Sequence, residues 1–184
     1  MYYEAFLAAL ARNQRLGLSD FLPPAKSAMQ QQWLTSQAVE ELPYIIHYAL
    51  GPLNAAQLSA QCIALHYRLA PVVKRWLRCE VYYTVGWVDF EAGGHYFYCD
   101  EAYLQQLLTK GTPDPKVKLH AWLTLPSMEI IDITFSTTLA KGDFAADLSL
   151  NVLARRADAL VGMAYRPMLL GADFLYRAGF VQAH

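Results

Sequence analysis

The spacing of apolar residues changes near Cys79, and this change limits the folds open to the sequence. Before Cys79, apolar residues recur at intervals of three and four, which is typical of amphipathic helices. From Glu80 to Phe90 the period becomes two, and the segment is rich in β-branched and aromatic residues, as strands are. Helices followed by strands predict an α+β fold.

The first part of the chain is predicted to be helical. Residues 4–15 form one expected helix, and residues of about 25–41 form a second, which Pro43 is expected to end. Residues 44–50 fit either a helix or a strand. Residues 1–50 are therefore interpreted as an N-terminal helical extension that contributes packing.

The next helix, beginning near Leu58, carries a cysteine in an informative position. If the hydroxyl of Ser59 caps this helix, Cys62 lies in its first turn. The unpaired backbone N–H groups and the positive end of the helix dipole there favour a thiolate. Asn54 is the rival cap, and it would place Cys62 deeper in a longer helix. Pro71 is expected to kink or end the helix.

The strands that follow bring in a histidine and an aspartate. Residues 118–123 and 130–134 are predicted to be strands joined by a tight connection, and they carry His120 and Asp132. A connection of odd length would set these two residues opposite each other, whereas a two-residue loop would set them one step out of register.

The expected organisation is a single domain over residues 1–184. A core of catalytic type is expected at residues 54–138, between the N-terminal extension and a C-terminal helical segment at residues 139–184.

Composition excludes several classes of function. The formal net charge is −1, so the chain has no general attraction to nucleic acid or to an anionic membrane. No apolar run of 18 residues occurs, and no basic segment precedes an apolar one at the N-terminus. The 55% apolar fraction is high and leaves room for a protein partner or a homo-oligomer formed through apolar helices.

Cysteine usage indicates the compartment. The three cysteines, Cys62, Cys79 and Cys99, include no C-x-x-C pair, which argues for reduced thiols in the cytoplasm. Export by a route without a cleaved signal would give the same pattern. A metal site built from Cys62, His66 and His120 lacks standard zinc spacing, and core packing is the preferred interpretation of His66.

Cys62, His120 and Asp132 follow one another in the order of a nucleophile, a base and the carboxylate that orients the base. The stretches that hold them resemble the transglutaminase-like branch of the papain-like cysteine protease superfamily. These stretches are Gln61–Cys62, Tyr83-Thr84-Val85-Gly86-Trp87-Val88, His120-Ala121-Trp122-Leu123 and Ile130-Ile131-Asp132-Ile133-Thr134. The resemblance spans roughly residues 58–135. It implies a papain-like core, in which a nucleophile helix packs on an antiparallel sheet, with flanking helices at both termini.

The resemblance also implies roles for individual residues. Cys62 would attack a carbonyl carbon and form a thioester, while His120 moves the proton and Asp132 orients His120. The backbone N–H of Cys62 and a side chain from Gln61 or Gln57 would meet the oxyanion. Trp122 would form a wall of the cleft beside the histidine. No metal or other cofactor is implied.

The expected function is therefore a thiol-dependent hydrolase or acyl transferase that acts on an amide or thioester bond of a peptide or protein. Hydrolysis by a cysteine peptidase or deamidase is favoured over transamidation, because nothing in the sequence points to an amine-acceptor site. Two alternatives stay open: a non-catalytic binding or interaction protein that keeps a papain-like fold, and an exported effector with the same chemistry.

Overall fold

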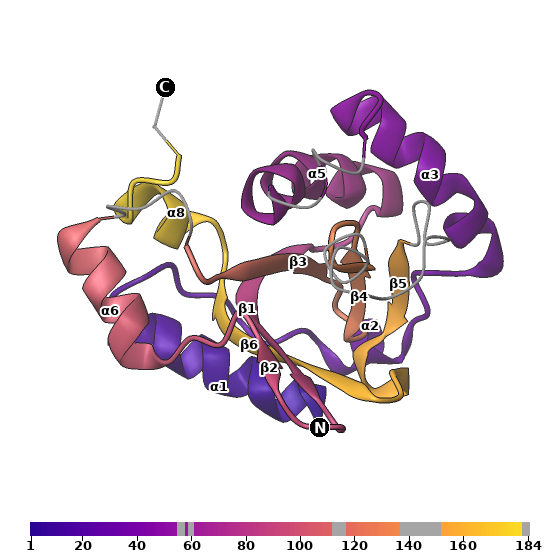
Figure 1. Ribbon diagram of the computed structural model, residues 1–184. Helices are drawn as coiled ribbons and strands as arrows, with labels where there is room; N and C mark the ends of the chain where they lie inside the picture. The colour runs from indigo at the N-terminus through magenta and orange to yellow at the C-terminus, as the bar shows by residue number, and fades with distance from the viewer. Residues whose placement is uncertain (55–57, 59–60, 112–116, 137–151, 182–184) are drawn as a thin grey trace. The chain divides into compact units, whose positions relative to one another are not determined.

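The computed structural model describes residues 1–54, 58, 61–111, 117–136 and 152–181 (Figure 1). It is a mixed α+β structure in which the strands pair antiparallel, and this confirms the predicted α+β class. The chain groups into two compact units, each assembled from separate segments. The first unit contains residues 1–23, 84–120 and 160–184, and the second contains residues 24–83 and 121–159.

The first unit is organised around a helix that packs on a strand. Helix α1 (Tyr2–Arg15) buries Phe6 and Leu10 on the face that contacts β6 (Met163–Leu170). The buried side chain of Asn13 fixes this contact, because its Nδ2 donates to the Leu170 carbonyl over 2.7 Å and its Oδ1 accepts from the Leu170 N–H. One amide thus satisfies both backbone groups of a buried strand residue.

Strand β1 (Tyr82–Phe90) is the predicted long strand, and all but its first two residues belong to the first unit. It pairs antiparallel with β6 and with the short strand β2 (His95–Tyr96). The pairing with β6 shifts between Val85 and Gly86, where Pro167 lies opposite Gly86. A proline has no N–H to give to a ladder, so it is tolerated at such an irregularity.

Two further helices complete the first unit. Helix α6 (Glu101–Lys110) starts at Asp100, whose carboxylate accepts from the Tyr103 N–H over 2.8 Å, and it ends at Gly111. Both ends agree with ordinary capping chemistry. Helix α8 (Asp173–Arg177) is short.

The second unit contains three helices in the described residues: α2 (Lys26–Gln30), α3 (Ser36–Leu50) and α5 (Cys62–Leu77). The expectation of one helix over about 25–41, ended by Pro43, was wrong. Thr35 caps a new helix by accepting from the Ala38 N–H, and Pro43 lies inside that helix on its exposed side. Helix α3 continues past the proline because Leu42 and Ile46 are buried on the face that packs against α5.

The strands of the second unit form an antiparallel series in the order β3 (His120–Thr124), β4 (Glu129–Asp132), β5 (Leu153–Arg156). The register pairs Leu123 with Ile131 and Thr124 with Ile130. Continued by one residue, this register sets Trp122 rather than His120 opposite Asp132. Three residues, Pro126, Ser127 and Met128, connect the strands, and the Leu125 N–H donates to the Glu129 carbonyl over 2.8 Å. The connection therefore has an odd length, but its position pairs Asp132 two residues away from His120.

The expected C-terminal helical segment at residues 139–184 was wrong wherever the structure describes it. Residues 152–181 contain β5, a 3-10 turn at Ala157–Ala159, β6 and only the short α8. The structure has half-buried strands where a helix was expected. A segment of mixed apolar spacing can form a strand when neighbouring strands are available to pair with it. Within the described residues, no helix is long and apolar enough to cross a membrane.

Candidate active site

Cys62 is the first residue of α5, and Gln61 occupies the N-cap position with φ −128° and ψ 26°. The cysteine thus lies in the first turn, as expected for a Ser59 cap and not for an Asn54 cap, although the helix starts later than either expected cap implied. The backbone carbonyl of Asn54 accepts from the Leu58 N–H, and Ser59 lies outside the described residues. The first N–H groups of a helix have no intrahelical partner, so the start of α5 can supply donors to an anion beside Cys62.

A tyrosine fixes the backbone next to Cys62. The buried Tyr83 hydroxyl donates to the Ile63 carbonyl over 3.1 Å, and its ring meets that of Tyr67 edge-on. Burial, with the nearby Cys62 as a second cause, raises the pKa of Tyr83 well above 10.0, so the hydroxyl keeps the proton that it donates. The first turn of α5 is therefore held from outside the helix.

His66 connects α5 to the residue after Asp132. Its Nδ1 lies 2.8 Å from the Cys62 carbonyl oxygen, which can only accept, so Nδ1 carries the proton. Its Nε2 then accepts from the Ile133 N–H over 3.1 Å. Since both ring nitrogens are used in this way, His66 is a neutral, fully buried histidine. This agrees with its interpretation as a packing residue, and it adds a defined link between the start of α5 and β4.

Asp132 is fully buried at the end of β4. Its Oδ1 accepts from the Thr134 N–H, the Thr134 hydroxyl and the Phe135 N–H, at 2.9, 3.1 and 3.0 Å. The same oxygen lies 3.6 Å from Nε2 of His66. Three donors on a single oxygen stabilise the ionised carboxylate, which is the form that an orienting aspartate requires.

His120 begins β3 and belongs to the first unit. Its ring is fully buried and stacks on the Phe97 ring, with centroids 5.5 Å apart and planes at 10°. The Tyr165 ring lies 6.3 Å away on β6. Phe97 adopts φ 58°, which a residue with a side chain rarely does, so its position against the histidine has a conformational cost. A stacked aromatic ring restricts the orientations open to the His120 imidazole.

The three cysteines occupy different environments. Cys62 is partly exposed, whereas Cys79 and Cys99 are buried. Burial, assisted by Glu80 for Cys79 and by Asp100 for Cys99, raises the pKa of each of these two thiols to about 12. They are therefore protonated near neutral pH and react slowly as nucleophiles.

The remaining predicted site residues have separate positions. Gln61 is exposed beside Cys62, while Gln57 lies outside the described residues. Trp122 is fully buried, with 0% of its surface accessible, in contrast to the expected position on the wall of a cleft. Its large apolar ring is part of the hydrophobic core, on the residue that the continued register sets opposite Asp132.

Two residues of this region were not predicted to contribute to the site. Tyr83 was noted as part of a strand and of a stretch that carries the family resemblance, without a role of its own. His66 was weighed as a metal ligand, and core packing was preferred. The i, i+4 spacing of Cys62 and His66 was the available signal, since it places a ring nitrogen near the carbonyl one turn back. The bond from Ile133 to His66 joins residues 67 positions apart and left no such signal.

Comparisons of the chain with protein families, with curated proteins and with solved structures found no match.

Proposed function

We propose that the protein is a thiol-dependent hydrolase or acyl transferase that acts on an amide or thioester bond of a peptide or protein. Its nucleophile is Cys62, its base is His120 and the orienting carboxylate is Asp132. The observation that carries the proposal is the position of Cys62, the partly exposed cysteine of the three, at the first residue of α5.

The surroundings of Cys62 support the first chemical step. The helix start offers backbone N–H groups for an oxyanion, and Tyr83 and His66 hold this turn in place. In the proposed reaction, the thiol proton passes to His120 as sulfur bonds to the carbonyl carbon. His120 then returns the proton to the leaving group, and water releases the acyl group from the thioester.

The surroundings of Asp132 support its proposed role. An orienting aspartate has to stay ionised and keep one geometry, and the three donors on Oδ1 provide both conditions. Hydrolysis is the proposed outcome, by a papain-like thiol enzyme of the transglutaminase-like type. This finer classification depends on the motifs around Cys62, His120 and Asp132.

The test is the rate of alkylation by iodoacetamide between pH 6 and 8, followed at each cysteine by mass spectrometry. We expect Cys62 to react at least about 10-fold faster than glutathione at pH 6.5, as an activated thiol does. Cys79 and Cys99 should react far more slowly than glutathione, because their thiols are buried.

Exposure alone could make Cys62 react faster than the other two cysteines. The variants that decide whether His120 activates the thiol are therefore His120→Gln and His120→Ala. Each should return Cys62 to the rate of glutathione or below and remove the acid limb of its pH profile. Circular dichroism establishes that each variant is folded. If Cys62 reacts no faster than glutathione in the unmodified protein, or keeps its rate without His120, the proposal fails.

A further inference from the structure

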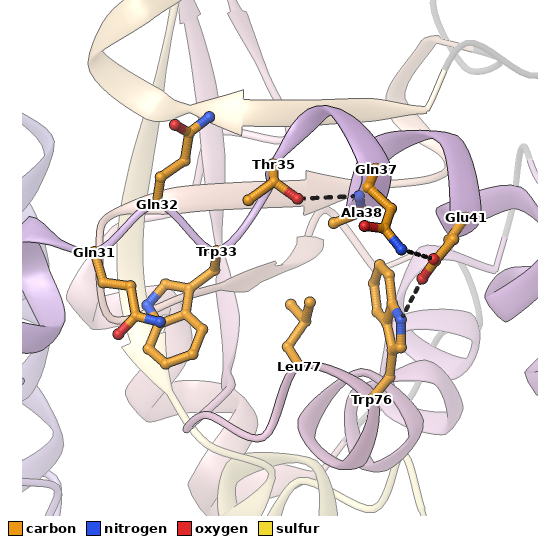
Figure 2. A pocket seen from close by; sticks show the side chains of 9 residues that line it. All are labelled: Gln31, Gln32, Trp33, Thr35, Gln37, Ala38, Glu41, Trp76 and Leu77. Atoms are coloured by element: carbon orange, nitrogen blue, oxygen red, sulfur yellow. Dashed lines mark hydrogen bonds between the residues drawn. The ribbon is translucent and has the colours of Figure 1, made fainter.

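A pocket of about 290 Å³ opens in the second unit, where the segment before α3 meets the C-terminal end of α5 (Figure 2). Its lining combines two tryptophans with glutamines and small polar groups. These residues are Gln31, Gln32, Trp33, Thr35, Gln37, Ala38, Glu41, Trp76 and Leu77. All of them lie in described segments, and no lysine, arginine or histidine is among them.

One side of the pocket is a preformed hydrogen-bonded group. The Trp76 indole Nε1 donates to one oxygen of Glu41 over 3.2 Å, and the Gln37 amide donates to the other over 2.7 Å. Both carboxylate oxygens thus already accept a hydrogen bond, as the dashed lines of Figure 2 show. The Trp76 ring is fixed at its edge, so its face is held in one orientation.

The other side of the pocket carries Trp33, which is anchored through its backbone. Its N–H donates to the buried carboxylate of Glu129 over 2.9 Å. Its indole Nε1 is buried and has no hydrogen-bond partner among the described residues. A buried indole N–H without a partner has a free-energy cost, which a ligand oxygen or a turned Gln31 amide could remove.

Helix α3 carries two exposed tyrosine rings on the face that also holds two residues of the pocket. Gln37, Glu41, Tyr44 and Tyr48 are spaced at i, i+4, i+7 and i+11, so they share one face of the helix. Tyr44 and Tyr48 are 77% and 78% exposed, which is unusual for two large rings on one helix face. The stripe formed by these four residues extends beyond the pocket itself.

The geometry points to a binding site for an uncharged saccharide, with the pocket taking one sugar unit and the α3 stripe the next units of a chain. Flat indole rings pack well against the C–H faces of a sugar ring. The amides and the Thr35 hydroxyl supply both donors and acceptors, as a ligand rich in hydroxyl groups requires. An anion finds no cationic partner in this lining, and the carboxylate of Glu41 already accepts one hydrogen bond from Trp76 and one from Gln37.

This site is separate from the proposed catalytic residue of the same helix. Trp76 follows Cys62 by 14 positions on α5, which corresponds to about 21 Å along the axis of an α-helix. Saccharide binding can therefore be tested without any assumption about the thiol, and the two proposals can fail independently.

The experiment is isothermal titration calorimetry of the full chain with uncharged tetrasaccharides, namely β-1,4-linked N-acetylglucosamine, β-1,4-linked glucose and α-1,4-linked glucose. We expect saturable 1:1 binding of at least one of them, with a Kd between about 10 µM and 5 mM. Trp76→Ala should weaken binding at least 10-fold, and Trp76→Phe, which keeps a ring but loses the bond to Glu41, should weaken it less. Trp87→Ala, a tryptophan of β1 in the first unit, is the matched control and should leave the Kd unchanged.

The α3 stripe has its own variant. Tyr48→Ala should weaken the tetrasaccharide about 3-fold and leave the corresponding disaccharide unaffected. Absence of binding to all three tetrasaccharides at 20 mM overturns the proposal, as does a Kd that is unchanged in folded Trp76→Ala protein. Competition by tetramethylammonium or by an unrelated peptide at the same residues would identify a cation or peptide site and would equally overturn it.

Discussion

The two ends of strand β4 each carry a buried carboxylate, but these carboxylates are held in different ways. Asp132 takes its hydrogen bonds from Thr134 and Phe135, two and three residues further along the chain. Glu129 takes its hydrogen bonds from the N–H groups of Trp33 and Leu34, 96 and 95 positions away, and from the hydroxyl of Ser127.

The two buried carboxylates differ in how far along the chain their hydrogen-bond donors lie. Oδ1 of Asp132 accepts its hydrogen bonds from its own turn, and Nε2 of His66 lies 3.6 Å from the same oxygen. Glu129 joins the segment before α3 to the β3–β4 turn, and its carboxylate accepts from the backbone N–H groups of Trp33 and Leu34, which would otherwise need another partner. We therefore expect Asp132 to matter for reactivity and Glu129 to matter for stability.

The largest expected effect is on activity. Asp132→Asn should lower the rate of a Cys62-dependent amide or thioester hydrolysis by about 10³- to 10⁴-fold, because the neutral amide cannot orient or stabilise an imidazolium. Glu129→Gln should change that rate by less than about 3-fold, because truncations that leave the reacting groups in place have small effects. The measurement is hydrolysis of a peptide thioester, with iodoacetamide reactivity of Cys62 as a second readout. Equal losses in the two folded variants would mean that Asp132 has only a structural role.

The same pair shows what a sequence can predict. Asp132 could be singled out because a charged residue inside the apolar run Ile130–Ile133 requires a partner, and because it follows Cys62 and His120 in the order of a triad. Glu129 was not singled out, since nothing near it in sequence indicates that residues 33 and 34 supply its partners. The start of α5 was predicted from two possible caps, Ser59 and Asn54, whereas the observed N-cap is Gln61, which makes no side-chain capping bond. The bond between His66 and Ile133 was not predicted.

The next effect is on stability, where the order of the two carboxylates should reverse. In Glu129→Gln, the new NH₂ group faces an N–H or hydroxyl donor, so at least one bond to a buried charge is lost and about 1.5–3 kcal/mol of unfolding free energy with it. In Asp132→Asn, the carbonyl oxygen can still accept the three bonds that Oδ1 receives, and the expected loss is about 1 kcal/mol. Urea unfolding at pH 7 measures both losses, and a larger loss for Asp132→Asn would contradict the distinction.

Secondary structure follows the same division between local and distant causes. Helix α6 has both of its ends specified locally, by Asp100 and Gly111. Strand β6 was missed because its identity depends on pairing with β1, about 80 positions earlier in the chain. Pro43 was predicted to end a helix because proline is a local stop signal. The packing of α3 against α5, which is a distant contact, outweighs this signal.

The smallest expected effect concerns a third carboxylate, which is exposed. It tests whether burial determines how much a carboxylate contributes to stability. Glu101 is 39% exposed and pairs with Arg15 at 2.7 Å and with Arg12 at 3.2 Å. The hydrogen bond from Arg15, with that from Arg12 as a lesser cause, lowers the pKa of Glu101 below its ordinary value of 4.5. A lowered folded-state pKa means that the pair stabilises the protein above pH 4.5 and that this stabilisation is lost as the pH falls through the folded value.

Solvent screening keeps this contribution small, at about 0.5 kcal/mol. We expect Glu101→Gln to lower the unfolding free energy by that amount at pH 7 and by less at pH 2.5, because the glutamate gains protons as the pH falls. The exposed Glu91→Gln serves as the control at both pH values, and 0.5 M NaCl should reduce the difference at pH 7. A loss at pH 7 as large as that of Glu129→Gln would show that ion pairing, rather than burial with distant backbone donors, sets the stability contribution of a carboxylate in this protein.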